Sequence, residues 1–125
     1  MNKLFKIIEF PFFSDDRGNV RPVEFKNIPF VPQRFFTTSA HNENTVRGKH
    51  GHYECHQLLF SIRGNIQVNI KTSDFDEMVI LEPNGKALYL PPKHWASQTF
   101  VKGDEILGCL ASHSYDAADV YENIL

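Results

Sequence analysis

The sequence predicts an all-β domain, built as a sandwich or barrel of short antiparallel strands, and three observations support this class. Short apolar or alternating runs recur along the chain, and turn residues separate them. The chain contains 11 phenylalanines, a residue type enriched in strands. Helical periodicity is scarce, since only residues 116–124 form a candidate helix, and a short one. Short strands at this spacing are typical of sandwiches and barrels.

The clearest strands are expected between residues 58 and 111. The run 58–62 ends at Arg63-Gly64-Asn65, and the strictly alternating run 66–70 follows, which predicts a hairpin. Similar apolar runs bounded by turn residues predict further strands at 78–81, 87–90, 97–101 and 106–111. Candidate strands in the first 40 residues lie at 6–10, 19–25 and 34–39.

Length and charge restrict the class of protein. A chain of 125 residues is long enough for one core and too short for two, so we expect a single domain over residues 1–125. The net charge of −2 argues against nucleic-acid binding, because there is no basic stripe to neutralise phosphates. We find no apolar leader and no run long enough to span a bilayer, so we expect a soluble, cytoplasmic protein with no membrane contact. Cys55 and Cys109 form no CxxC pair, which favours free thiols over a disulfide.

The segment Arg47-Gly48-Lys49-His50-Gly51-His52 is the most informative part of the sequence. Residues i and i+2 of an extended strand point to the same face, so the two imidazoles should project together. Two imidazoles on one wall can bind a metal ion or transfer protons near neutral pH. A purely structural role, with both rings hydrogen-bonded across the sheet, is the remaining alternative.

The spacing of these histidines resembles the metal-binding motif of the cupin barrel, a small jelly roll. The chain reads His50-x-His52-x4-Gln57-x6-Gly64, with glutamine where cupins usually have glutamate. A second cupin frame begins at Gly85 and ends at Pro91, but Ala96 stands where the last metal histidine would fall. Because a zinc or iron site needs about three protein ligands, often with an anionic one, we expect no functional metal. A metal-dependent enzyme that uses His50 and His52 with His56 or His94 is the alternative.

Without a metal, the histidine pair suits proton transfer. Unperturbed imidazole titrates near pH 6.5, so one ring can act as a base while the other acts as a conjugate acid. This chemistry can move a proton between the carbons beside a carbonyl group, through an enediol. It requires no redox cofactor and no covalent intermediate, and we therefore expect no cofactor.

Beyond the cupin frame, the chain resembles the cupin-fold sugar-nucleotide 3,4-ketoisomerases, which act on thymidine-diphosphate 4-keto-6-deoxyhexoses. The resemblance covers about nine-tenths of the chain and rests on an ordered set of residues. This set comprises Asp16-Arg17-Gly18, Glu24, Asn27-Ile28-Pro29-Phe30, Arg34, Arg47-Gly48-x-His50-x-His52, Gln57, Gly64, Pro91, Trp95 and Leu110-Ala111-Ser112-x-x-Tyr115-Asp116-x-x-Asp119.

The resemblance implies a 3,4-keto shift in which His50 and His52 are the acid–base pair. The 3-keto product would then serve an aminotransferase that makes 3-amino-3,6-dideoxyhexoses. The resemblance also implies a homodimer in which a strand near the N-terminus crosses to the partner subunit. Substrate-binding roles are expected as follows: Arg47, Arg17 and Arg34 at the diphosphate or sugar, Gln57 at the sugar hydroxyls, and Trp95 stacked on the thymine or sugar ring.

One segment departs from the family pattern. The family usually continues from the Arg34 position into a valine and two tyrosines, one of them implicated in catalysis, whereas this chain has Phe36 and Thr37 at the tyrosine positions. Thr37 or Tyr53 is the candidate replacement hydroxyl. The loss predicts an altered stereochemical course, a different acid, or a protein that binds a sugar nucleotide without isomerising it.

Overall fold

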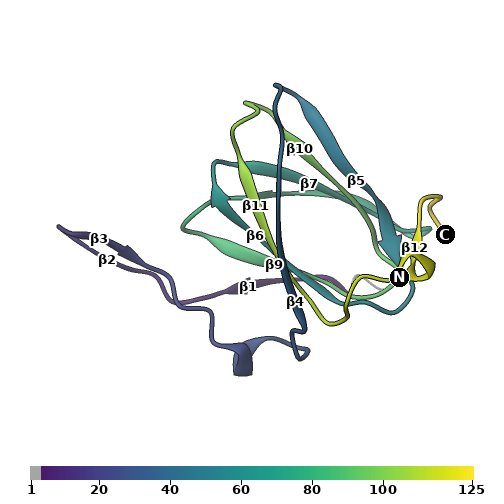
Figure 1. The fold of residues 1–125 in the computed structure, drawn as a ribbon, viewed down its shortest axis with the longest axis horizontal. Helices are drawn as coiled ribbons and strands as arrows, with labels where there is room; N and C mark the ends of the chain where they lie inside the picture. Colours follow the sequence, from purple (N-terminus) through teal and green to yellow (C-terminus); the bar gives the residue numbers. More distant parts are fainter. Residues whose placement is uncertain (1–3) are drawn as a thin grey trace.

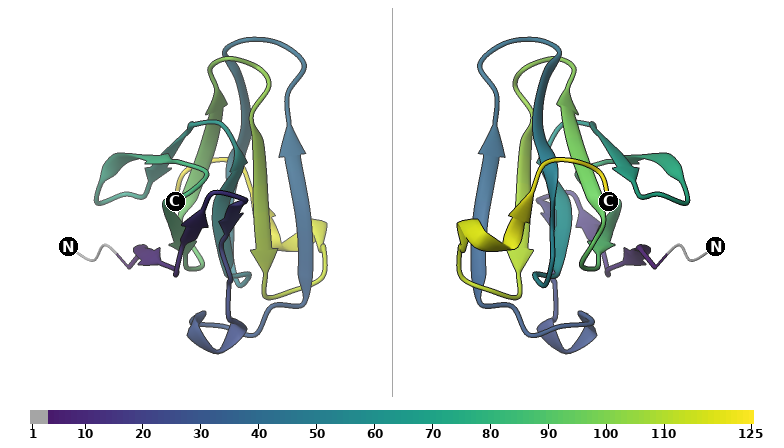
Figure 2. Two further views of the ribbon diagram at one scale, coloured as in Figure 1. Left: turned by 90° about the vertical axis from the view of Figure 1, so that its left-hand side faces the viewer. Right: turned by 90° about the vertical axis from the view of Figure 1, so that its right-hand side faces the viewer.

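The computed structural model of the protein describes residues 4–125, and strands dominate this range (Figure 1). Residues 1–3, on which the leader expectation partly rests, lie outside it. Two five-stranded antiparallel sheets pack face to face (Figure 2), which confirms the all-β class. The first sheet has the order β1-β9-β6-β11-β4, with strands β1 (Lys6–Glu9), β4 (Arg34–Ser39), β6 (Gln57–Arg63), β9 (Lys86–Leu90) and β11 (Ile106–Ala111).

The second sheet has the order β12-β5-β10-β7-β8. Its strands are β5 (Thr45–His52), β7 (Ile66–Lys71), β8 (Asp76–Leu81), β10 (Trp95–Phe100) and β12 (Val120–Tyr121). The strands predicted at 34–39 and 106–111 have those bounds, and the others predicted between residues 58 and 101 are present with ends shifted by one or two residues.

The main core fills the space between the two sheets. It is made of the inward side chains of strands from both sheets, which are Leu59, Ile66, Val68, Ile70, Leu81, Leu88, Leu90, Ala96, Phe100, Leu107 and Cys109. Cys55 and Cys109 are both buried and free, as expected. Burial of about ten such side chains is the main stabilising contribution to the fold.

The hairpin predicted for residues 58–70 is wrong. β6 pairs with β9 and β11, whereas β7 pairs with β8 and β10, so the chain passes from one sheet to the other at Gly64. Gly64 has a φ of +78°, and a Cβ there would lie 2.6 Å from Glu105 Cγ. This crossing places Leu59 and Val68 in the same core from opposite sheets. The alternating pattern is satisfied by either arrangement, because both bury one face of each strand.

The strand predicted at 19–25 is also largely wrong. Only the short strand β3 (Gly18–Val20) forms, paired with β2 (Phe13–Asp15), and a 3-10 turn η1 (Phe25–Asn27) follows. Pro22 has no N–H for a strand ladder. Arg21 instead anchors this segment to the body, because its guanidinium donates to the backbone carbonyls of Ser61 (2.9 Å) and Pro83.

No helix forms over residues 116–124. A 3-10 turn η2 (Ala117–Asp119) leads directly into β12, which pairs with β5. Asp116 caps the turn, since its carboxylate accepts a hydrogen bond from Ala118 N at 3.0 Å. Such local side-chain bonds compete with helix formation. Over residues 4–125, no helix has the length and hydropathy required to cross a membrane.

The β2–β3 hairpin projects from the body as an arm (Figure 1). Phe13 and Val20 face each other across this hairpin, and both are 62% exposed. Exposed apolar side chains on a projecting ribbon are typical of a surface that another chain covers.

Candidate active site

The two histidines lie together at the end of β5. Their ring centroids are 5.2 Å apart and the rings are nearly perpendicular, which confirms that His50 and His52 share a face. Gly51 lies between them because a side chain there would collide with the ring of Tyr121 on β12. Glycine at this position therefore permits Tyr121 of β12 to pack against the outer side of β5, while the imidazoles on either side of the glycine face inward.

A cavity of about 130 Å³ opens beside this pair, between the two sheets. Its lining comes from β4, β5, β6, β10 and β11, and consists of Phe36, Thr38, Arg47, Gly48, His50, Gln57, Leu59, Gln98 and Leu107. Of the two histidines, His50 belongs to this lining, and His52 lies behind it in contact with Gln57. The cavity combines an imidazole, a guanidinium and two carboxamides with an apolar floor, a composition typical of small-molecule sites.

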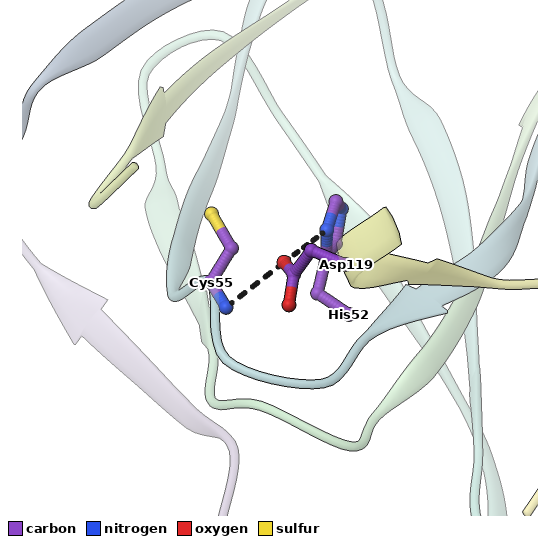
Figure 3. Close-up of side chains that lie close together, drawn as sticks. All are labelled: His52, Cys55 and Asp119. Carbon is purple, nitrogen blue, oxygen red and sulfur yellow. Dashed lines mark hydrogen bonds and ion pairs between the residues drawn. The ribbon is translucent and has the colours of Figure 1, made fainter. Parts of the chain in front are cut away.

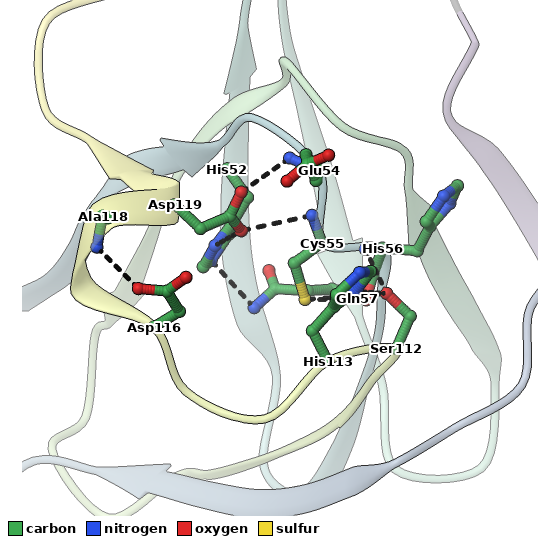
Figure 4. Close-up of polar contacts among 10 residues, drawn as sticks. All are labelled: His52, Glu54, Cys55, His56, Gln57, Ser112, His113, Asp116, Ala118 and Asp119. Carbon is green, nitrogen blue, oxygen red and sulfur yellow. Dashed lines mark hydrogen bonds and ion pairs between the residues drawn. The ribbon is translucent and has the colours of Figure 1, made fainter.

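Asp119 orients His52 from the side opposite the cavity. Its carboxylate lies 3.1 Å from His52 Nδ1 and also accepts hydrogen bonds from the backbone N–H groups of Glu54 (2.7 Å) and Cys55 (3.2 Å), as Figure 4 shows. Burial raises the pKa of Asp119, but these hydrogen bonds outweigh it and lower the pKa below its ordinary value. Asp119 is therefore an anion that fixes the imidazole from one side.

The hydrogen bonds define the tautomer of His52. Nδ1 donates to the Asp119 carboxylate, so Nε2 carries the lone pair and accepts from the Gln57 amide nitrogen at 3.3 Å. Burial lowers the pKa of His52, and the contact with Asp119 opposes this shift without reversing it. The ring is thus neutral at pH 7, with its basic nitrogen on the cavity side.

Two arginines bring positive charge to this end of the sandwich. Arg47 lines the cavity, and its Nη1 donates to the Ser39 carbonyl at 3.0 Å, which links β5 to β4. Arg34 lies 4.4 Å from the ring centroid of Phe36, and its charge contributes to the lowered pKa of His52. Arg47 and Arg34, both expected to bind the substrate, therefore lie next to the histidine pair.

The segment that departs from the family pattern lies on β4. Phe36 and Thr38 face the cavity, whereas Thr37 is exposed on the opposite face of the strand. Tyr53 packs against Tyr121, with ring centroids 5.0 Å apart and the rings tilted by 44°, and is not part of the cavity lining. The hydroxyl that β4 brings to the cavity therefore belongs to Thr38, which the sequence interpretation did not consider.

Two expected substrate-binding residues lie apart from the cavity within one chain. Arg17 is at the tip of the β2–β3 arm, where its exposed guanidinium pairs with Asp15 at 2.7 Å. Trp95 is not part of the cavity lining, because Ala96 and Gln98 are the inward residues of β10. Its indole N–H donates to the Glu122 carbonyl at 2.8 Å, which holds the C-terminal segment against the sheet.

The residues at the cupin metal position do not fit a metal ion. Gln57 supplies no negative charge, and Ala96 supplies no ligand where the last histidine of the motif would lie. The alternative ligand His56 bonds the Tyr89 hydroxyl at 2.8 Å, and His94 Nδ1 bonds the Pro92 carbonyl at 3.0 Å.

Asp119 and Gln98 are site residues that the sequence interpretation missed. Asp119 belongs to the residues that carry the family resemblance, but no role was assigned to it. Gln98 lies directly against Gly48: a Cβ at Gly48, where φ is +81°, would be 2.7 Å from the Gln98 side-chain oxygen. A strand glycine that permits close approach of a neighbour is a signal that could have identified this contact.

Acid should destabilise the protein below about pH 6.5. Burial holds the pKa of His52 and that of His56 below the ordinary value of 6.5, so the unfolded chain binds more protons in this interval. The free energy of unfolding therefore falls as the pH falls. Urea unfolding at about pH 7.5 and about pH 5.5 measures this. His52→Asn should reduce the difference between the two values, and an unchanged difference would contradict the contribution of His52.

The fold and the cavity define this protein as a small cupin-type jelly roll with a histidine-based site between its sheets. A family model described as "FdtA: WxcM-like, C-terminal" matches residues 3–124, and the chain belongs to this family.

Proteins of known activity are similar to the chain over most of its length. The TDP-4-oxo-6-deoxy-alpha-D-glucose-3,4-oxoisomerase of Aneurinibacillus thermoaerophilus is 29% identical over 115 residues, which is 91% of this chain and 83% of that protein. The crystal structure of QdtA, a sugar 3,4-ketoisomerase from Thermoanaerobacterium thermosaccharolyticum in complex with TDP, has a TM-score of 0.91 and 28% identity, covering 98% of this chain and 90% of that one. A histidine-to-asparagine variant of QdtA in complex with TDP-4-keto-6-deoxyglucose has the same TM-score and coverage at 27% identity.

Proposed function

We propose that this protein is a sugar-nucleotide 3,4-ketoisomerase that converts a thymidine-diphosphate 4-keto-6-deoxyhexose into its 3-keto isomer. The observation that carries the proposal is the arrangement of His50 at the cavity wall, with His52 and Asp119 aligned behind it. The activity of the similar oxoisomerase and of QdtA supports the choice of substrate class.

In the proposed reaction, His50 removes the proton from C3 of the sugar while O4 gains a proton, which gives a C3–C4 enediol. The hydroxyl at O3 then loses its proton and C4 gains one, so the carbonyl group moves to C3. The atoms and electrons balance without a redox cofactor. His52, whose ring lies 5.2 Å from that of His50, relays protons between the cavity and the protein.

The size and polarity of the cavity match the sugar end of such a substrate. Its volume of about 130 Å³ is below the roughly 300–1,000 Å³ of pockets for drug-sized ligands, so the nucleotide has to lie outside it. Gln57 and Gln98 offer carboxamides to the sugar hydroxyls. Arg47 at the opening, with Arg34 nearby, offers the diphosphate the planar donor groups that bind phosphate oxygens in pairs.

The projecting β2–β3 arm supports the proposal of a homodimer. We propose that the arm crosses to a second copy of the chain and carries Arg17 toward the partner's substrate. The exposed Phe13 and Val20 are the apolar contacts that this crossing would bury.

Charging the arm should therefore weaken the dimer. Val20→Asp should shift the protein toward a monomer in sedimentation equilibrium and raise KM, because the partner's arm no longer reaches the substrate. Asn19→Asp, at the neighbouring exposed position of β3, is the matched control and should leave the dimer intact. A monomeric wild-type protein would contradict the crossing.

The activity itself is tested by incubating the purified protein with TDP-4-keto-6-deoxyglucose and following the sugar resonances by NMR. The expected result is the appearance of the 3-keto isomer or its decay products. Binding of TDP without any change in the sugar would instead support the second candidate, a sugar-nucleotide-binding protein. The presence of Phe36 at the cavity, where the family has a hydroxyl, is the observation that favours this candidate.

A further inference from the structure

Three metal-ligand groups converge on the face of His52 that points away from the cavity. An imidazole nitrogen of His52, the Sγ atom of Cys55 and a carboxylate oxygen of Asp119 all lie within 4.8 Å of one another. Figure 3 shows the three residues. His52 and Asp119 have side-chain exposures of 14% and 12%, and Cys55 is buried. This set differs from the cupin metal position. The cupin position uses ligands that face the cavity, whereas Cys55 and Asp119 lie on the other side of His52.

The donor set suits zinc. Zn²⁺ binds cysteine sulfur at about 2.3 Å and histidine nitrogen or carboxylate oxygen at about 2.0–2.2 Å, so its ligand atoms lie about 3.2–3.7 Å apart in a tetrahedron. The 3.1 Å separation of His52 Nδ1 and the Asp119 oxygen is already close to this value. The Cys55 sulfur, which lies within 4.8 Å of the other two ligand atoms, has to move toward the third corner when the metal binds.

An acidic depression gives a route from solvent to this group. A cavity of about 430 Å³ on the side of the turn η2 is lined by Glu54, His113, Ser114, Tyr115, Asp116 and Asp119. Three of these six residues are carboxylates, and they attract cations. Asp119 belongs both to this cavity and to the three-ligand group, so an ion that enters the cavity reaches one of the three proposed ligands there.

We propose that His52, Cys55 and Asp119 form an inhibitory site for Zn²⁺, reached from the acidic cavity. The Cys55 thiol loses its proton when sulfur binds the metal. The metal takes the Nδ1 position of His52, so the ring proton moves to Nε2 and the neutral imidazole loses its lone pair on the cavity side. A proton-relay ring is thereby held in the wrong tautomer. The inhibition rests on the proposed isomerase function, whereas metal binding does not.

Cobalt(II) tests the binding step directly, because a Co²⁺–thiolate bond produces an intense near-ultraviolet charge-transfer band. The wild-type protein titrated with Co²⁺ should show this band with one equivalent per chain, and Zn²⁺ should remove it. Cys55→Ala should abolish the band. Cys109→Ala removes the other buried thiol and is the matched control that should retain it. No band in the wild-type protein, or a band that persists in Cys55→Ala, would overturn the proposal.

The inhibitory step is tested separately on the ketoisomerase reaction. Zn²⁺ should inhibit the wild-type protein and Cys109→Ala, whereas Cys55→Ala should be active and resistant, since its backbone N–H still bonds Asp119. Equal inhibition of both variants would overturn the proposed site. If the protein lacked isomerase activity, the cobalt band would still report the metal site, so the two failures are distinguishable.

Discussion

His50→Asn should lower kcat by about 10²–10⁴-fold, the usual contribution of a general base. His50 is the imidazole that lines the cavity, and asparagine has a similar polarity but no basic nitrogen at neutral pH. The affinity for TDP, measured by calorimetry, should change little, because the proposed complex places the nucleotide outside the cavity. NMR of the sugar protons under saturating substrate measures kcat.

The control for this substitution is His41→Asn, which changes an exposed histidine in the segment between β4 and β5. We expect wild-type turnover for this variant. If His50→Asn also retained wild-type turnover while folded, His50 would not be the base.

Asp119→Asn should lower kcat by about 10²–10⁴-fold, because removal of the carboxylate that fixes the tautomer of a catalytic histidine can cost as much as about 10⁴-fold in kcat. Asp119 holds the proton of His52 on Nδ1, and an asparagine amide can stabilise the opposite tautomer. Asp119 also raises the pKa of His52 against the effect of burial. Its removal should therefore move the acidic limb of the kcat profile to lower pH.

A structural role for Asp119 predicts a different result. Its carboxylate also accepts hydrogen bonds from the backbone of Glu54 and Cys55. If the main effect of Asp119→Asn were to release this loop, the substitution would reduce substrate binding as well as kcat. Asp116→Asn is the matched control, since Asp116 caps the same turn through Ala118 without touching His52. An Asp119→Asn variant with an unchanged pH profile and a proportional loss of TDP binding would contradict the positioning role.

The sequence predicted local features of the fold better than its connections. Strands 34–39 and 106–111 have the expected bounds, the first with burial that alternates along the strand and the second as a largely apolar run that is almost wholly buried. The pairing of β6 with β7 was wrong because alternation specifies which face of a strand is buried, and not which strand lies beside it. The β2–β3 arm has almost no buried residues, so it left no periodic signal.

The site residues divide in the same way, into those that one strand specifies and those that depend on how the strands pair. His50 and His52 could be paired from sequence because two residues of one strand share a face by geometry alone. Asp119 lies 67 residues after His52, and its contact depends on β12 returning to pair with β5. The composition of the cavity wall likewise depends on strand order, which brings Gln98 and Thr38 to the histidines from β10 and β4.

The measurement that most directly tests proton transfer through an enediol is the reaction with TDP-4-keto-6-deoxyglucose in D₂O, followed at C3 of the sugar by NMR. Removal of the C3 proton by His50 predicts loss of the C3 proton signal in the presence of the wild-type protein and a much slower loss with His50→Asn. Retention of the C3 proton by the wild-type protein, with TDP shown to bind, would contradict the ketoisomerase mechanism.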